Sequence, residues 1–216
     1  MLTLKIKHAP RVPVVGASLT KKWHLTAALC IGLLSTNGVS AALVSSLGGQ
    51  IVNDTTNNIA WLANANLAAT NTFGVTGINP NGSMSWFTAQ KWISAMNAVN
   101  YLGYNDWRLS ASDACMGYNC TKTEMGNLFY NGLGGVAHSS IIAAHNANLA
   151  LFNNVQSGIY WSGMEYAPGT ACAWNFGTYG GFQDTYGKGG NLFVVAVRSG
   201  QVSAVGGPVR LHRKFH

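Results

Sequence analysis

The stretch of sequence that decides the fold lies near the C-terminus: Tyr160-Trp161-Ser162-Gly163, then Trp174-Asn175-Phe176, then Phe193-Val194-Val195-Ala196-Val197-Arg198-Ser199-Gly200. Two aromatic-rich, strand-like runs and one apolar strand are separated by loops rich in Gly, Tyr and Asn, with almost no charge. Such a segment can pack a β-core while its loops present Tyr, Trp, Asn and Gln to a ligand. It offers little that could act as a nucleophile or a base, so the pattern favours binding.

The surrounding sequence predicts an α+β domain. Strands are expected over 159–161, 171–176 and 192–197, with the Tyr- and Gly-rich connections between residues 165 and 186 as loops. Upstream, the runs 50–54 and 58–62 flank a short polar turn and predict a hairpin. Strands, then helices, then strands in one domain indicate a mainly antiparallel sheet.

Two helices are expected between these strand regions. The first begins after Ser85 as N-cap, because Trp86, Ala89, Ile93 and Met96 recur at helical spacing, and Gly103 is a natural terminator. The second begins at a capping box formed by Thr121-x-x-Glu124, in which the two side chains would satisfy each other's backbone donors. Its apolar residues continue to Leu133, and Gly134-Gly135 would end it.

Composition favours an exported protein. Only 9% of the residues are charged, against about 25% in an average globular domain. The net charge of +7 comes from the two ends of the chain, since five basic side chains face six acidic ones between residues 42 and 209. The body of the protein is therefore near neutral, which argues against nucleic acid as a partner.

The N-terminus resembles a secretory signal peptide. Lys21-Lys22 precede the apolar run Leu25–Leu34, and Val39-Ser40-Ala41 has small residues where signal peptidase cleaves. The apolar run is shorter than the roughly 20 residues of a membrane-spanning helix, and a retained membrane anchor is the alternative. We therefore expect a signal peptide over 1–41, a single domain over 42–205, and a basic, disordered tail over 206–216.

The cysteines predict one local disulfide. Cys115 and Cys120 lie five residues apart in a loop-like stretch of a chain expected to be exported. A metal site would need more soft ligands than these two. Cys172 is expected to be a buried thiol, and Cys30 would leave with the signal peptide.

Residue patterns that carry catalysis are scarce. No Gly-x-Ser-x-Gly motif is present. His138 and His145 have no carboxylate near them in the sequence, so we expect solvated or capping histidines and no bound metal. Asp106 or Glu165 is expected to form a structural salt bridge with Arg108 or Arg198. The acidic and Asn side chains could supply oxygen ligands to calcium, although no Asp-x-Asp-x-Asp-Gly loop supports such a site. We expect no enzyme activity and no cofactor.

The order of motifs resembles a known family. Seven motifs follow one another along the chain: Trp61-Leu62, Ser85-Trp86-x-x-Ala89, Gly103-Tyr104-Asn105-Asp106-Trp107-Arg108-Leu109, Glu124-Met125-x-x-Leu128-Phe129, Tyr160-Trp161-Ser162-x-x-Glu165-Tyr166, Ala173-Trp174-Asn175-Phe176 and Val195-Ala196-Val197-Arg198. This order, over roughly residues 48 to 202, is similar to the bacterial exported Lcl C-terminal-like domain, typified by the C-terminal domain of a collagen-like adhesin.

The resemblance implies a compact C-type-lectin-like domain, related to formylglycine-generating-enzyme-like folds, that is secreted or held at the cell surface. It implies adhesion to a glycan or a protein and no catalytic residues. By analogy with the lectin-like fold, the ligand contacts would lie on loops before the final strand. These candidate residues are Glu165, Tyr166, Asn175, Tyr179, Gln183, Asp184 and Tyr186.

Two further functions stay open at this stage. One is an enzyme of the formylglycine-generating type, whose chemistry uses reactive cysteines. The other is a structural subunit of a surface appendage or matrix, and homo-oligomerisation is compatible with either reading. The near-neutral body also lacks the basic surface expected of a protein that binds sulfated glycans.

Overall fold

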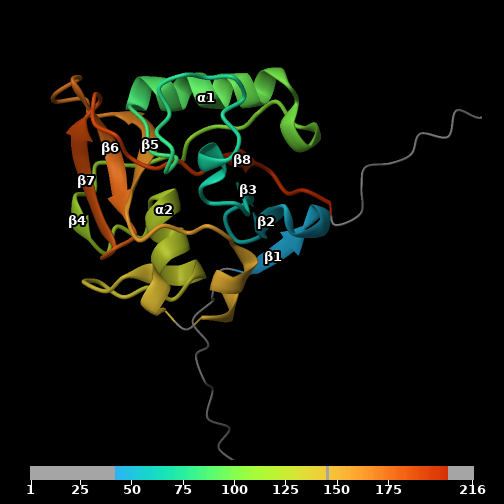
Figure 1. Cartoon of the computed structure of the whole chain (residues 1–216). Coiled ribbons are helices and arrows are strands. Elements are labelled where there is room, and N and C mark those ends of the chain that lie inside the picture. The colour runs from blue at the N-terminus through green and yellow to red at the C-terminus, as the bar shows by residue number, and fades with distance from the viewer. Residues whose placement is uncertain (1–41, 145, 204–216) are drawn as a thin grey trace, which may run out of the picture. The chain divides into compact units, whose positions relative to one another are not determined.

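Two four-stranded antiparallel sheets and two α-helices make up the described part of the chain (Figure 1). The computed structural model describes residues 42–144 and 146–203, which belong to one compact unit. The predicted α+β class, with antiparallel pairing and two helices, is confirmed. The predicted signal peptide, the predicted tail and His145 lie outside the described residues. None of the helices in the described ranges is long and apolar enough to span a membrane.

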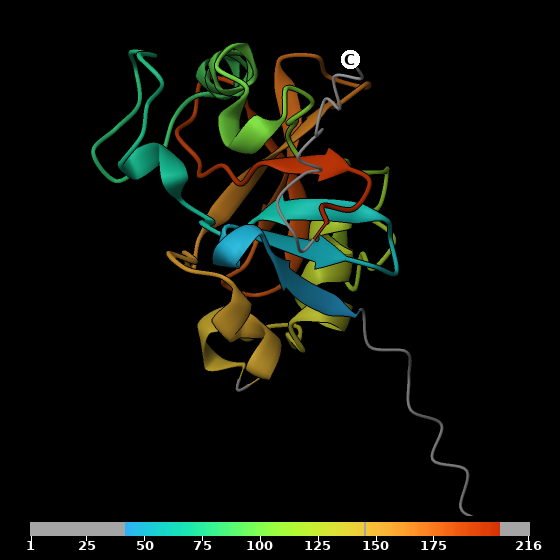
Figure 2. The same cartoon turned by 90° about the vertical axis from the view of Figure 1, so that its right-hand side faces the viewer.

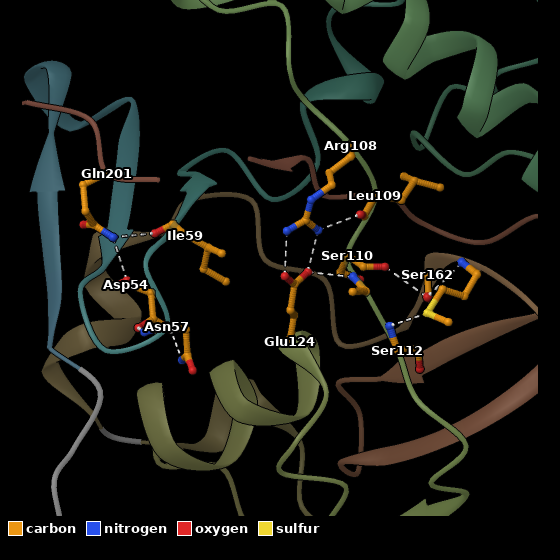
Figure 3. A network of polar contacts seen from close by, with 12 residues as sticks. Asp54, Asn57, Ile59, Arg108, Leu109, Ser110, Ser112, Glu124, Ser162 and Gln201 are labelled. Carbon is orange, nitrogen blue, oxygen red and sulfur yellow. Dashed lines mark hydrogen bonds and ion pairs between the residues drawn. The ribbon is translucent and has the colours of Figure 1, made fainter. Parts of the chain in front are cut away.

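The first sheet has the strand order β1-β2-β3-β8. Its strands are β1 (Leu43–Ser46), β2 (Ile51–Asp54), β3 (Ile59–Leu62) and β8 (Val197–Ser199). β2 and β3 form the predicted hairpin. The Asp54 carboxylate accepts hydrogen bonds from the amides of Thr56 and Asn57 and so holds the turn. The side-chain amide of Gln201 donates to the backbone carbonyls of Asp54 and Ile59, which ties the end of the domain to the hairpin (Figure 3).

The second sheet has the strand order β4-β7-β6-β5. Its strands are β4 (Gly117–Tyr118), β5 (Ile159–Glu165), β6 (Cys172–Gly177) and β7 (Phe182–Gly187). The prediction that the sequence around Tyr186 is a loop was wrong, because residues 182–187 pair with the whole of β6. The turn between β6 and β7 uses Gly181 with φ of +78°, a conformation that glycine adopts without steric cost.

Helix α1 (Trp86–Ala98) begins where the sequence predicts. The Ser85 hydroxyl accepts a hydrogen bond from the Thr88 amide, which confirms the N-cap. The helix ends before the predicted terminator Gly103, because Asn100 adopts a left-handed conformation with φ of +48°. α1 lies along the second sheet, next to β5 (Figures 1 and 2).

Helix α2 (Glu124–Asn127) corrects the predicted cap. The N-cap is Thr123, whose hydroxyl accepts from the Gly126 amide, and not Thr121. Glu124 does not turn back to cap the helix, because its carboxylate binds the Arg108 guanidinium and the Ala111 amide. The helix continues as a π-helical turn, Leu128–Gly132.

A crossing segment, residues 192–197, joins the two sheets and replaces the single strand predicted there. Leu192 exchanges two backbone hydrogen bonds with Met84, just before α1. Phe193 bonds to β5 by donating to the carbonyl of Ile159, and the Ala196 carbonyl accepts from the amide of Leu62 in β3. Only the end of the segment enters a regular ladder, as the start of β8.

The core contains every tryptophan of the predicted domain. Trp61, Trp86, Trp92, Trp107, Trp161 and Trp174 are each at most 9% exposed. The buried residues form two clusters. One includes Trp92 and Trp161 beneath α1, and the other includes Trp61 and Phe129 next to α2. The prediction that most tryptophans pack in the core is confirmed.

Three ion pairs within the described residues hold loops to the framework. Arg198 binds Asp106, as the sequence allowed, with Nε 2.7 Å from Oδ1, and its guanidinium lies 4.1 Å from the centre of the Tyr104 ring. Arg108 instead pairs with Glu124. The third pair joins Lys188 and Glu165.

The pair between Arg198 and Asp106 should make stability depend on pH. Hydrogen bonds from Arg198 lower the pKa of Asp106 below its ordinary value of 3.8. The carboxylate therefore stabilises the fold above pH 3.8, and this contribution is lost as the pH falls through the lower folded pKa. We expect Asp106→Asn to lower Tm at neutral pH, with the difference from wild type shrinking between about pH 5 and about pH 2.

Thermal unfolding followed by circular dichroism at several pH values measures this difference. Asp106 is half exposed, so about 1 M salt should also reduce it by screening. A difference that stays constant from neutral to acid pH would contradict the assignment of the stabilisation to this carboxylate.

Gly126 should not tolerate a side chain. A Cβ atom at this position would overlap the backbone carbonyl oxygen of Cys120 and press on the Thr123 hydroxyl. We expect Gly126→Ala to lower the free energy of unfolding by about 1–3 kcal/mol, because a packed backbone must shift. Gly189→Ala is the matched control, since apart from Gly189 and its two chain neighbours no atom of the described residues lies within 4 Å of the place that its Cβ would take. Urea denaturation compares the two, and equal stabilities would refute the packing argument.

Candidate functional site

An open groove lies between the disulfide-closed loop and the end of β5. Its volume is about 490 Å³. We call it the Trp174 groove. Its lining residues are Asp113, Ala114, Met116, Met164, Glu165, Tyr166, Ala167, Pro168 and Trp174. The loop before β4 therefore meets the β5–β6 hairpin, which contributes the end of β5, the turn and the middle of β6.

Two aromatic rings form the apolar part of the groove. Trp174 is 6% exposed, so the protein covers most of its ring. Tyr166 packs edge-on against it, with the ring centres 5.3 Å apart. The turn after β5 fixes Tyr166, because its amide donates to the carbonyl of Cys172 and its carbonyl accepts from Gly169. The aromatic surface is therefore held in place before any ligand arrives.

Two methionines present thioethers on the groove. Met116 is 51% exposed and Met164 is 43% exposed. A β-bulge between Trp161 and Glu165 interrupts the pairing of β5 with β6 just where Met164 lies. The Met164 sulfur accepts a hydrogen bond from the Ser112 amide at 3.3 Å, which fixes one methionine across the groove. Exposed, polarisable thioethers adapt to varied ligand surfaces.

The loop that forms one wall is held from three sides. The predicted disulfide between Cys115 and Cys120 is confirmed. The Gln183 side chain, 1% exposed, donates to the carbonyls of Asp113 and Cys115. The Tyr130 hydroxyl accepts from the Asn119 amide and donates to the carbonyl of Gly181. These contacts make the wall part of the sheet framework.

The charged side chains that line the groove are both carboxylates. Asp113 accepts a hydrogen bond from the Cys115 amide, which caps the start of the loop. Glu165 binds the ammonium of Lys188, a residue only 6% exposed. That ammonium also lies 4.7 Å from the centre of the Trp86 ring. Lys188 is therefore satisfied by a carboxylate and an aromatic face, as a buried cation requires.

A second hollow adjoins the groove and shares Met164 with it. Its volume is about 250 Å³, and it is lined by Gln90, Arg108, Leu109, Ser110, Ala111, Gly163 and Met164. Both terminal nitrogens of Arg108 bind the Glu124 carboxylate at 2.7 Å (Figure 3). These hydrogen bonds raise the pKa of Arg108, so its guanidinium stays charged and the Glu124 carboxylate balances that charge. The Ser162 hydroxyl donates to the carbonyl of Ser110 and so ties this lining residue to β5 (Figure 3).

The sequence profile of the Lcl C-terminal domain matches residues 50–198. The chain belongs to the Lcl C-terminal domain family. The match includes both sheets apart from β1, and all the residues of the groove. A comparison with curated proteins finds no match.

The structure brings together only part of the predicted ligand site of this Lcl C-terminal domain. Glu165 and Tyr166 line the groove. Tyr179 lies at the turn between β6 and β7, at the other end of these strands. Asn175 and Gln183 are 5% and 1% exposed, so their side chains face the interior.

The remaining candidates lie on the sheet face that packs under α1. Asp184 pairs with Asn175 in the register, and Tyr186 pairs with Ala173. The Tyr186 ring lies 6.4 Å from that of Trp161. The expectation that the candidates lie on loops was wrong for those in strands β5, β6 and β7, although a role in ligand contact stays a prediction.

Several groove residues were missed by the sequence analysis. Trp174 was assigned to the core alone, and Met116 and Met164 were not considered as contacts. The available signal was Met116, an apolar residue inside a short polar loop between two cysteines. Cys172 was expected to be buried, but it is partly exposed and unpaired among the described cysteines. Among the described residues, no group of three or more His, Cys, Asp or Glu side chains could hold a metal ion.

The disulfide should matter more for the shape of the groove than for stability. Replacing both Cys115 and Cys120 by Ala opens a very short loop, so the loss of unfolding free energy should stay below the roughly 3 kcal/mol of a 15-residue loop. We expect hydrogen exchange of the amides from 112 to 118 to accelerate, because the wall then depends on hydrogen bonds alone, including those of Gln183 and Tyr130.

Cys172→Ser is the control for this experiment, because it removes a thiol that pairs with no cysteine of the described chain. It should leave exchange in the loop unchanged. Unaltered exchange in the double variant would show that the side-chain hydrogen bonds suffice to hold the wall.

Proposed function

We propose that the protein is a secreted or cell-surface adhesion domain that binds a glycan or a protein through the Trp174 groove, without catalysis. The observation that carries this proposal is the exposed thioether and aromatic lining of a pre-shaped groove. Met116 and Met164 expose about half of their surfaces there, in a chain that buries most of its other large apolar residues around two cores. Large apolar side chains exposed together mark interaction sites.

Membership of the Lcl C-terminal domain family supports an extracellular role. The disulfide is consistent with the same location, since disulfides persist in oxidising compartments. The signal-peptide pattern of residues 1–41 adds to this proposal from the sequence.

The arrangement of the cysteines supports binding over the formylglycine-generating type of chemistry. That chemistry uses reactive cysteines, whereas Cys115 and Cys120 are joined to each other. Cys172 is the free cysteine of the described residues. A thiol titration of the native protein that reacts with both members of the disulfide would support the enzymatic alternative.

A binding screen followed by groove variants tests the proposal. The purified protein is screened against a glycan array and immobilised extracellular proteins, and the strongest ligand is measured by titration. We expect Met116→Ala and Tyr166→Ala each to weaken binding about tenfold, because burial of such a side chain contributes about 1.5–3 kcal/mol.

Tyr179→Ala is the matched control, because Tyr179 is 49% exposed and lies outside the groove. It should bind with the wild-type affinity. Circular dichroism and thermal unfolding of each variant show that the fold is retained. Loss of binding in the Tyr179 variant, with the groove variants unchanged, would move the site to the turn between β6 and β7.

A further inference from the structure

We propose that the Trp174 groove takes the cationic side chain of a protein segment, a lysine or an arginine. This inference rests on the proposed function and names the ligand class of the same groove. It assigns the groove to a basic protein partner and not to an acidic glycan.

The charges of the groove have one sign. Among the described residues, its lining includes the carboxylates of Asp113 and Glu165 and no Lys or Arg. Asp113 forms no ion pair within the described residues, so its charge is not neutralised at close range. A sulfate or a second carboxylate entering the groove would meet like charge, which is unfavourable at short distance. A cation would find a partner there.

Glu165 presents its carboxylate outward although it is ion-paired. Its side chain is 50% exposed, whereas that of Lys188 is only 7% exposed. The ammonium is enclosed between Glu165 and the Trp86 ring. The solvent-facing part of this pair is therefore acidic. A carboxylate can accept further hydrogen bonds at its free lone pairs, and an incoming ammonium or guanidinium supplies such donors.

The apolar lining suits the rest of a basic side chain. Lysine and arginine bury their methylene stems along apolar surface and keep the charged end at polar groups. Met116 and Met164 offer adaptable surface for such a stem. Tyr166, which is partly exposed, adds an aromatic ring, and such rings attract cations at their faces. The same lining would hold a neutral sugar by stacking, but a sugar would leave Asp113 without a charged partner.

Lys122 gives this inference an internal check. It is exposed, and it lines a hollow of about 380 Å³ beside the disulfide, together with Asp113. Lys122 therefore lowers the local negative potential, although the ion pairs of the described residues do not include one between it and Asp113. Its removal should strengthen the binding of a cation, whereas it should weaken the binding of an anion.

The experiment measures short oligolysine and oligoarginine peptides, acetylated and amidated at their ends, against the intact purified protein by fluorescence anisotropy. Oligoglutamate, heparin and a neutral chito-oligosaccharide are the comparison probes. We expect the basic peptides to bind, and Asp113→Asn to weaken them about five- to tenfold. Asparagine keeps an acceptor for the Cys115 amide, so the loop should retain its shape. Lys122→Gln should tighten binding about twofold or more.

Asp184→Asn is the matched control. It removes the same charge from a residue of β7 that lies outside the groove and forms no ion pair within the described residues. It should change affinity by less than about twofold. Equal losses in the two variants would show attraction to net charge alone and overturn the proposed groove contact.

The failure of this inference is distinguishable from failure of the proposed function. If heparin or the neutral sugar binds, and Met116→Ala weakens that binding, the groove is a ligand site but its ligand is not a cation. If basic peptides bind and Met116→Ala leaves them unchanged, they occupy another surface and the inference is wrong. If no probe and no screened ligand responds to groove variants, the proposed function fails with it.

Discussion

The backbone pairing of the crossing segment, residues 192–197, is the constraint on which the rest of the structure depends. Its hydrogen bonds reach the entry to α1, the second sheet and the first sheet in turn. Ala196 and Val197 are fully buried, so their backbone groups bond to Leu62 and Arg108 in place of water. A segment buried between two sheets must therefore form backbone hydrogen bonds to both of them, and this requirement fixes how the sheets meet. The Trp161 indole strengthens the junction by donating to the carbonyl of Met84.

The groove follows from this junction. β5 is held at its beginning by Phe193, so its irregularity falls near the other end, at the bulge before Glu165. The bulge releases Met164 from the regular alternation and places its sulfur against Ser112. On the opposite side, Gln183 ties the disulfide loop to β7. Both walls are therefore attached to strands of one sheet, and the groove does not need a ligand to form.

The sequence predicted the features that local chemistry determines. Ser85 and the spacing of the apolar residues after it placed α1, and the two cysteines five residues apart placed the disulfide. β7 was missed because Gln183, its buried residue, is polar and is satisfied by the disulfide loop instead of by an apolar core. The cap at Thr121 failed for a related reason, since Glu124 is engaged by Arg108 from a distant segment. Long-range hydrogen bonds leave no periodic trace in the sequence, and the groove is built from them.

The few charged side chains of this domain serve mainly to join distant segments. Arg108, Lys188 and Arg198 each neutralise one acid and attach a loop to a strand or a helix. Asn, Ser and Thr side chains supply many of the other polar contacts, some to nearby backbone and some to distant segments. Asp54, Asp113 and Asp184 lie outside these ion pairs, and of these three Asp113 lines the groove beside Met116 and Met164. The contribution of the Asp113 side chain to the framework is one capped amide, and this residue lines a groove that the sheet already holds open. The structural role of Asp113 needs only an acceptor, which asparagine would supply equally well, so its charge is the property that a ligand can use.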